Sequence, residues 1–243
     1  MQPLYVQEFL INDMAVDRYG YLKPSAILFY AQEVAGQHCN QLSVDYDTLA
    51  KRRMFWAVIR HRVQITRLPV RGETIRVETW PMPTTRSAYP RSVVAYDAQG
   101  RECFRSISLW VLMNLDTRAM ILPGKSGIEV AGTLRGNELA APSALAPGKL
   151  SNRRSRRICY TDLDRNGHIN NTRYLDWIDD LLPSEFHVDN RPREITVCYY
   201  SEGREGQELE LQWDFLQEGI LQVDAHRFGM EKDERIFSAR IQY

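Results

Sequence analysis

One short pattern occurs twice in the chain. Asp17-Arg18-Tyr19-Gly20-Tyr21 and Asp164-Arg165-Asn166-Gly167-His168 share Asp, Arg and Gly, and an offset of 147 positions relates them. The same offset relates two sets of mostly apolar residues: Ile27, Leu28, Ala31, Val34, Ala35 and Tyr174, Leu175, Ile178, Leu181, Leu182. Each set has the i, i+1, i+4, i+7, i+8 spacing of an amphipathic helix. The duplication restricts the fold to two similar halves, each with one such helix.

Segments of alternating polar and apolar residues follow each predicted helix. Thr74–Trp80 and Leu209–Trp213 alternate clearly, and Arg101–Leu109 resembles Glu234–Gln242. Strict alternation is typical of antiparallel strands with one face buried. A single helix and a curled antiparallel sheet bury each other's apolar faces, so the sequence predicts an α+β fold with one helix and one sheet per half.

The halves are separated by a segment rich in Gly, Pro and Ala. It contains five of the fourteen glycines and the prolines Pro123, Pro142 and Pro147, a composition typical of linkers. We expect an N-terminal domain at residues 1–125, a linker at 126–150 and a C-terminal domain at 151–243.

Charge and cysteine usage exclude several classes of protein. The 243 residues carry 31 basic and 31 acidic side chains, without the basic excess of a nucleic-acid-binding protein. No apolar run approaches the ~18 residues of a membrane-spanning helix. Residues 1–9 lack the basic stretch of a signal peptide. The four cysteines are scattered, which favours reduced thiols. We therefore expect a cytoplasmic protein with no membrane span and no nucleic-acid partner.

The second copy of the pattern lies in a longer motif, Asp162-Leu-Asp-Arg-Asn-Gly-His-Ile-Asn-Asn-Thr-Arg-Tyr-Leu-Asp-Trp177. This run resembles the D-L-D-x-N-x-H-[VI]-N-N signature of the acyl-acyl-carrier-protein thioesterase family. Met54-Phe55-Trp56 and Trp110-Val-Leu-Met-Asn114 resemble first-half segments of the same family. The resemblance covers nearly the whole chain. It implies two tandem hotdog domains, catalysis in the second, an acyl carrier protein as partner, no cofactor and a role in fatty acid biosynthesis.

Four residues are candidates for catalysis: Asp164, Asn166, His168 and Glu202. Hydrolysis of a thioester needs a base that activates water and donors for the developing oxyanion. The first three alternate at i, i+2, i+4, so an extended segment would project them to one side, just before a helix N-terminus that favours an oxyanion. The spacing of Glu202 from this motif matches the catalytic glutamate of the family. We expect Glu202 to be the base, with its pKa raised in an apolar pocket, although a nucleophilic role stays open.

The first half lacks this set, because Tyr21 stands at the position of His168 and Tyr19 at that of Asn166. We expect the first half to shape the acyl pocket instead. Some members of the family have a cysteine directly after the glutamate, where this chain has Gly203. Cys198 lies four residues before Glu202, so a cysteine nucleophile is not expected.

Two further sets are candidates for substrate binding. Asn170 and Asn171 precede the second predicted helix, where either residue suits an N-cap. Arg153, Arg154, Arg156 and Arg157 form a basic run about ten residues before the motif. The run is either a solvated strand edge or a docking site for an acidic carrier protein. If it forms a strand, alternation sends its arginines to both sides.

Other functions find less support. Gly124-Lys125-Ser126 resembles the end of a phosphate-binding loop, but Ala119 stands where that loop requires glycine. The histidines form no cluster with metal-ligand spacing, so we expect no metal. Two alternatives remain: an acyl-CoA thioesterase on the same scaffold, and an acyl-binding module without activity. A homodimer is compatible with the sequence.

Overall fold

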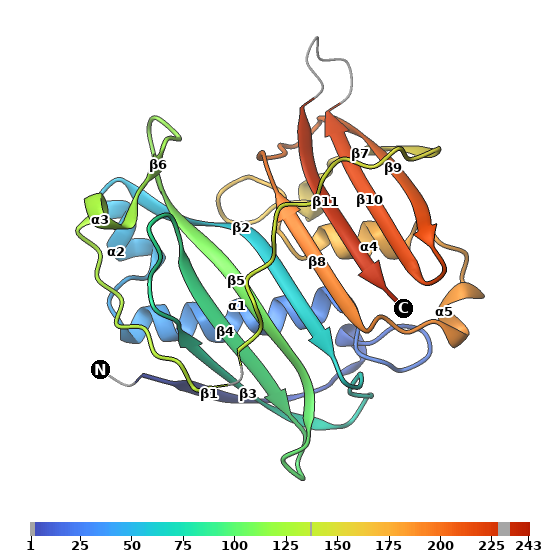
Figure 1. Ribbon diagram of the computed structural model, residues 1–243, viewed down its shortest axis with the longest axis horizontal. Coiled ribbons are helices and arrows are strands. Elements are labelled where there is room, and N and C mark those ends of the chain that lie inside the picture. The colour runs from blue at the N-terminus through green and yellow to red at the C-terminus, as the bar shows by residue number, and fades with distance from the viewer. Residues whose placement is uncertain (1–2, 137, 228–233) are drawn as a thin grey trace. The chain divides into compact units, whose positions relative to one another are not determined.

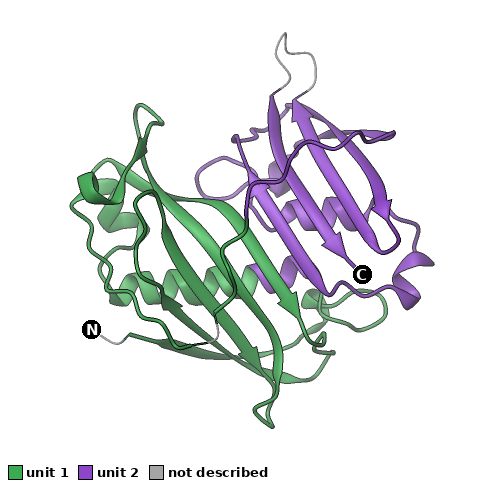
Figure 2. Ribbon diagram, viewed as in Figure 1, with its two compact units in different colours: residues 1–23, 29–142 green, residues 24–28, 143–243 purple. Residues whose placement is uncertain are grey.

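The structure is a computed structural model that describes residues 3–136, 138–227 and 234–243. The chain divides into two compact units, of residues 1–23 with 29–142 and of residues 24–28 with 143–243 (Figure 2). The long helix α1 (Pro24–Gln41) therefore contributes its first five residues to the second unit. No helix of the described residues is long and apolar enough to cross a membrane.

Unit 1 contains an antiparallel sheet with the strand order β1-β3-β4-β5-β2, and the short β6 pairs with β5 (Figure 1). Its strands are β1 (Tyr5–Leu10), β2 (Met54–Ile65), β3 (Thr74–Pro81), β4 (Tyr89–Tyr96), β5 (Glu102–Asn114) and β6 (Met120–Ile121). Besides α1 there are η1 (Asp13–Ala15), α2 (Tyr46–Lys51) and α3 (Pro123–Ser126). The predicted apolar stripe of α1 is buried at all five positions, as expected for a helix that packs against a sheet.

Unit 2 repeats this sheet with the order β8-β11-β10-β9-β7. Its strands are β7 (Asn152–Arg157), β8 (Glu194–Tyr199), β9 (Glu208–Gln217), β10 (Ile220–Arg227) and β11 (Arg235–Gln242). The helices are η2 (Tyr160–Asp162), α4 (Arg173–Asp179) and α5 (Phe186–Asp189). Both sheets thus place their strands in the same chain-order pattern, so the predicted duplication and the tandem hotdog, α+β fold are confirmed.

The second helix is shorter than its apolar stripe suggested. Tyr174, Leu175 and Ile178 are buried within α4, but the helix ends at Asp179, before Leu181 and Leu182. Pro183 follows Asp179 by four residues, and a proline cannot continue a helix without losing a backbone hydrogen bond. The prediction of a helix through Leu182 was therefore wrong.

The segment from residue 127 to 151 has no helix or strand in its described part. Its last residues are nevertheless fixed on unit 2 by hydrogen bonds. The Leu145 carbonyl accepts from Tyr200 Oη at 3.0 Å, and Gly148 N donates to the buried Asp224 carboxylate at 2.8 Å. The C-terminal end of this segment therefore packs against unit 2.

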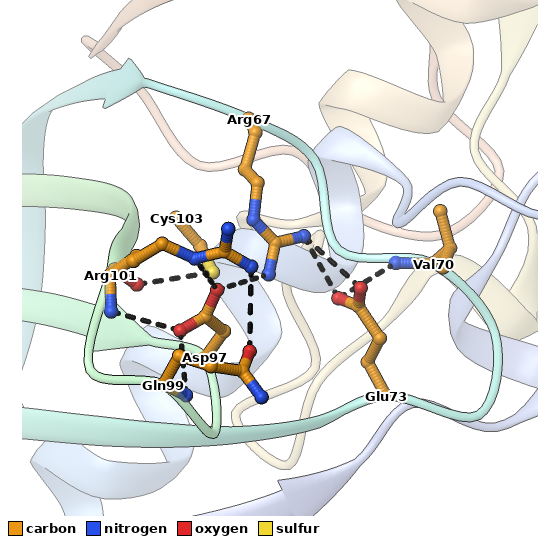
Figure 3. A network of polar contacts seen from close by, with 7 residues as sticks. All are labelled: Arg67, Val70, Glu73, Asp97, Gln99, Arg101 and Cys103. Carbon is orange, nitrogen blue, oxygen red and sulfur yellow. Dashed lines mark hydrogen bonds and ion pairs between the residues drawn. The ribbon is translucent and has the colours of Figure 1, made fainter.

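A polar network ties together two connections of unit 1 (Figure 3). Arg67 lies between Glu73 and Asp97, at 2.9 Å and 3.0 Å, and Arg101 Nε donates to Asp97 at 2.8 Å. Burial opposes ionisation of Asp97, but hydrogen bonds from Arg101, Arg67 and Gln99 lower its pKa to about 2. The β4–β5 turn is thereby fixed to the β2–β3 connection.

Candidate active site

The motif residues Asp164–His168 form a tight turn. Asp164 N donates to the His168 carbonyl at 2.7 Å, and Leu163 pairs with Ile169 as an isolated β-bridge. Gly167 has φ of 74°, a left-handed conformation that glycine adopts without steric cost. The expectation of an extended segment was wrong, because this glycine turns the chain back on itself.

The Asp164 carboxylate stabilises the turn by accepting hydrogen bonds from residues within it. It accepts hydrogen bonds from Asn166 N at 2.8 Å, from His168 N at 3.3 Å and from Asn166 Nδ2 at 3.3 Å. Asp17 does the same in unit 1, where it accepts from Tyr19 N at 2.9 Å and Tyr21 N at 3.0 Å. Asp164 is thus part of a loop conformation that both units share.

The imidazole of His168 meets the carboxylate of Glu202, with 3.0 Å between Nε2 and Oε2. The His168 side chain is 10% exposed and that of Glu202 is 36% exposed. Glu202 follows β8, and its backbone carbonyl accepts from Arg227 Nη2 at 3.0 Å. The apolar enclosure expected for Glu202 is not found, since this carboxylate is partly open to solvent and paired with a histidine.

A backbone hydrogen bond joins the two segments that carry His168 and Glu202. Ile169 N donates to the Gly203 carbonyl at 3.0 Å, directly beside the His168–Glu202 pair. A Cβ atom at Gly203 would lie 2.4 Å from Ile169 Cδ1 and 2.9 Å from Ile158 Cδ1. A larger residue at position 203 would therefore require these isoleucine side chains to shift.

Tyr174 is a neighbour of the site that sequence reasoning placed only in the core. Burial raises the pKa of its hydroxyl, and the charges of Asp164 and Glu202 raise it further. The phenol is 3% exposed and packs on Phe237, with 4.3 Å between the ring centroids. Tyr174 is thus a buried neighbour of the site, and the charges of Asp164 and Glu202 oppose ionisation of its phenol.

The two asparagines organise the chain ahead of α4. Asn170 Oδ1 accepts from Thr172 N at 3.0 Å and from Thr172 Oγ1 at 2.9 Å, and the Asn170 carbonyl accepts from Arg173 N at 2.9 Å. The Asn171 carbonyl accepts from Tyr199 Oη at 3.4 Å. The N-cap of α4 is Thr172, so the expectation of an asparagine N-cap was wrong. The N–H groups of Thr172 and Arg173 donate to Asn170, so these two donors do not face an oxyanion as the sequence suggests.

The basic run forms β7, an edge strand of unit 2, and its members divide by side as alternation requires. Arg154 Nη1 donates to the Asp180 carbonyl at 2.7 Å, and the Arg156 guanidinium lies 5.0 Å from the centre of the Trp177 ring. Arg153 forms an exposed ion pair with Glu210 at 3.1 Å, and Arg157 is exposed. Arg154 and Arg156 therefore contact α4 and the residue after it.

The cysteines differ in accessibility. Cys198 is fully buried, and its Sγ donates to the Ser143 carbonyl at 3.7 Å. Cys159 is exposed. Among the described residues, no group of three or more His, Cys, Asp or Glu side chains is arranged to hold a metal ion.

Unit 1 has other residues at the positions of the pair. Leu22 N donates to the Pro69 carbonyl at 2.8 Å, as Ile169 N does to Gly203 in unit 2. Leu68 therefore stands at the position of Glu202, and Tyr21 at that of His168. This position in unit 1 has neither an imidazole nor a carboxylate.

A cavity of about 310 Å³ lies within unit 1. Aromatic side chains of three strands, Trp56, Tyr89 and Trp110, form part of its lining. Arg91 also lines the cavity; it is 7% exposed and donates to His38 Nδ1 at 3.1 Å and Thr79 Oγ1 at 3.2 Å. Burial lowers the pKa of Arg91. The cavity is thus mostly apolar, with one buried cation at its wall.

Two family models match the chain. The model of the acyl-ACP thioesterase N-terminal domain matches residues 2–122, and that of the C-terminal domain matches residues 147–243. The chloroplastic palmitoyl-acyl carrier protein thioesterase of Gossypium hirsutum is 25% identical over 217 residues, which cover 82% of this chain and 52% of that protein. Oleoyl-acyl carrier protein thioesterase 1 of Arabidopsis thaliana, also chloroplastic, is 25% identical over 224 residues, covering 82% of this chain and 60% of that protein. The chain thus spans about half the length of such relatives.

Solved structures share the fold over nearly the full length. The crystal structure of an acyl-ACP thioesterase from Bacteroides thetaiotaomicron matches with a TM-score of 0.89 at 24% identity, covering 99% of this chain and 97% of that one. The 12:0-ACP thioesterase from Umbellularia californica matches with a TM-score of 0.83 at 20% identity, covering 100% of this chain and 97% of that one.

Proposed function

Since the chain belongs to the acyl-ACP thioesterase family, we propose that it hydrolyses the thioester of a fatty acyl chain carried by acyl carrier protein. Water attacks the thioester carbonyl, the carbon–sulfur bond breaks, and the products are a free fatty acid and the carrier thiol. The observation that carries this proposal is the 3.0 Å contact between His168 and Glu202.

Glu202 is the group best suited to activate the water. Its carboxylate is partly exposed, so water reaches it, and His168 Nε2 holds one oxygen in place. A carboxylate held in this way accepts a proton from water as the water attacks. Water attack suits the site better than a cysteine nucleophile, since Cys198 is buried and residue 203 is glycine.

The turn Asp164–His168 would position the histidine and a donor. The Asp164 carboxylate fixes the backbone of Asn166 and His168. Asn166 is exposed, and its Nδ2 donates one N–H to Asp164, so its second N–H can donate to the thioester oxygen. Such a donor stabilises the negative charge that develops on this oxygen during attack.

Unit 1 would bind the acyl chain. Its cavity has aromatic walls and a volume of about 310 Å³, features common to apolar ligand sites. Replacing Trp110 with Ala should enlarge the cavity and move the preference toward longer acyl chains. An unchanged chain-length profile in folded Trp110→Ala protein would place acyl selection elsewhere.

Thiol release from a panel of thioesters tests the function. The panel combines several acyl lengths with two carriers, acyl carrier protein and CoA, and detects the free thiol. The proposal requires a higher kcat/KM with acyl carrier protein. Faster turnover of the CoA esters would favour an acyl-CoA thioesterase, and binding without thiol release would favour a non-catalytic acyl-binding module.

A further inference from the structure

A second polar cluster lies beside the catalytic turn. Its centre is Asp162, which is 1% exposed. Asp162 Oδ1 lies 3.5 Å from Arg173 Nε and 3.9 Å from Arg156 Nη2, and accepts from Trp177 Nε1 at 3.4 Å. The cluster thus joins η2, the edge strand β7 and helix α4 around one buried carboxylate.

Asp162 also accepts two backbone hydrogen bonds, one from a residue before the catalytic turn and one from a residue after it. Its Oδ2 accepts from Cys159 N at 2.8 Å, before the turn. Its backbone carbonyl accepts from Asn170 N at 2.8 Å, after the turn. The position of His168 between these two anchors therefore depends on how Asp162 is held.

Unit 1 provides an internal comparison, because the same backbone is held there without ions. Lys23 N donates to the Ala15 carbonyl at 3.0 Å, the counterpart of the Asn170 bond to Asp162. At the offset of 147 positions, Asp162 corresponds to Ala15, Arg173 to Ala26 and Arg156 to Phe9. Phe9 packs on Tyr30, the counterpart of Trp177, with 4.6 Å between the ring centroids.

The comparison shows that this loop and strand do not need charges in order to fold. Burying a carboxylate between cations costs desolvation energy, and apolar replacements of similar volume are often neutral or stabilising. The ionic cluster is nevertheless present in the unit that contains His168 and Glu202, and apolar residues replace it in the other unit. The Asp162 carboxylate accepts hydrogen bonds from Cys159 N and Trp177 Nε1, which fix its direction, and the two guanidinium groups add ion pairs at longer range.

We infer that Asp162, held by Arg156 and Arg173, is a positioning residue that keeps His168 aligned with Glu202. This inference rests on the proposed function. It also separates Arg156 from the other arginines of β7, because the role of Arg156 is exerted on Asp162 and not on a carrier protein.

The test transplants the unit 1 residues into unit 2. The triple variant Arg156→Phe, Asp162→Ala, Arg173→Ala should unfold at the same or a higher denaturant concentration than the parent protein. Its kcat on a small neutral thioester should fall about tenfold to a hundredfold, the effect of a small misplacement at a reaction centre, with KM nearly unchanged. Parental kcat in the folded triple variant would overturn the inference.

Two further variants complete the design. Asp162→Asn keeps the shape of the side chain and should lower kcat several-fold, while Arg173→Lys keeps the cation and should retain most turnover. If the triple variant does not fold, parental kcat in Asp162→Asn overturns the inference instead. The matched control is Asp97→Asn, which removes the charge of a buried carboxylate that lies between two arginines in unit 1. This variant should have lower stability and an unchanged kcat.

An independent readout separates this inference from the proposed function. The ring resonances of His168, followed by NMR, should shift in Asp162→Asn and stay unchanged in Asp97→Asn. If the parent protein releases no thiol, the proposed function fails, and the NMR comparison still decides whether Asp162 positions His168. Unchanged His168 resonances in Asp162→Asn would overturn the inference.

Discussion

His168 Nε2 and Glu202 Oε2 lie 3.0 Å apart, although 33 residues separate them along the chain. The turn that begins at Asp164 carries the imidazole, and the segment after β8 carries the carboxylate. A backbone hydrogen bond from Ile169 N to the Gly203 carbonyl joins the two segments beside the pair. Unit 1 keeps the corresponding bond but has Tyr21 and Leu68 in place of the pair.

Thiol modification should leave activity largely intact. Cys159 is exposed, whereas Cys198 is fully buried, so a maleimide should label Cys159 first. Turnover after stoichiometric labelling, compared with that of Cys159→Ser treated in the same way, provides the measurement. Loss of activity in step with modification of Cys198 would instead support a cysteine nucleophile.

Charge reversal on β7 should separate carrier docking from chemistry. Arg153 and Arg157 are exposed, so Arg153→Glu with Arg157→Glu should raise KM for acyl carrier protein substrates severalfold at low salt and leave kcat nearly unchanged. Added salt should reduce the difference, because it screens the attraction of an acidic carrier.

A small neutral thioester is the control for this double variant and should react at the parental rate. If KM for the carrier substrate does not change, β7 is a solvated edge and the carrier docks elsewhere.

His61 should make unit 1 sensitive to acid. The residue is 3% exposed, and burial lowers the pKa of its imidazole to about 4. The unfolded chain, with an ordinary histidine pKa of ~6.5, binds the proton first as pH falls. The contribution of His61 to the free energy of unfolding is therefore complete above pH ~6.5 and should fall by about 2 kcal/mol between pH 7 and pH 5.

Denaturant titrations of His61→Leu at several pH values measure this effect. The variant should lose stability less steeply than the parent between pH 7 and pH 5. Val63→Ala, a change at a buried position of the same strand, should lower stability by the same amount at each pH. Parallel pH profiles for His61→Leu and the parent would exclude this role of His61.

Much of the fold follows from local patterns in the sequence. The apolar stripe of α1 and the alternation of β3 and β9 reflect burial of one face, which periodicity records directly. The turn at Asp164–His168 was missed, although Asn166-Gly167 is a strong turn signal. The alternation of Asp164, Asn166 and His168 suggested an extended segment there, but the positive φ of Gly167 produces a turn instead.

The surroundings of the site were less predictable. Arg156 looked like a member of a surface run, because its contacts with Asp162 and Trp177 depend on tertiary packing. Comparison of the two halves could have revealed it, since Phe9 and Ala15 stand at the equivalent positions. Only the family resemblance grouped Glu202 with His168 as candidates, because residues so far apart in sequence have no spacing rule of their own.

The most direct test of the account is the turnover of Glu202→Gln on an acyl-acyl carrier protein substrate. The substitution keeps the size of the side chain and removes the base, so kcat should fall ~100-fold or more in a folded protein. His168→Ala should behave similarly, while Tyr21→Phe, the control at the equivalent position of unit 1, should react at nearly the parental rate. Turnover of Glu202→Gln close to that of the parent would contradict the assignment of Glu202 as the base.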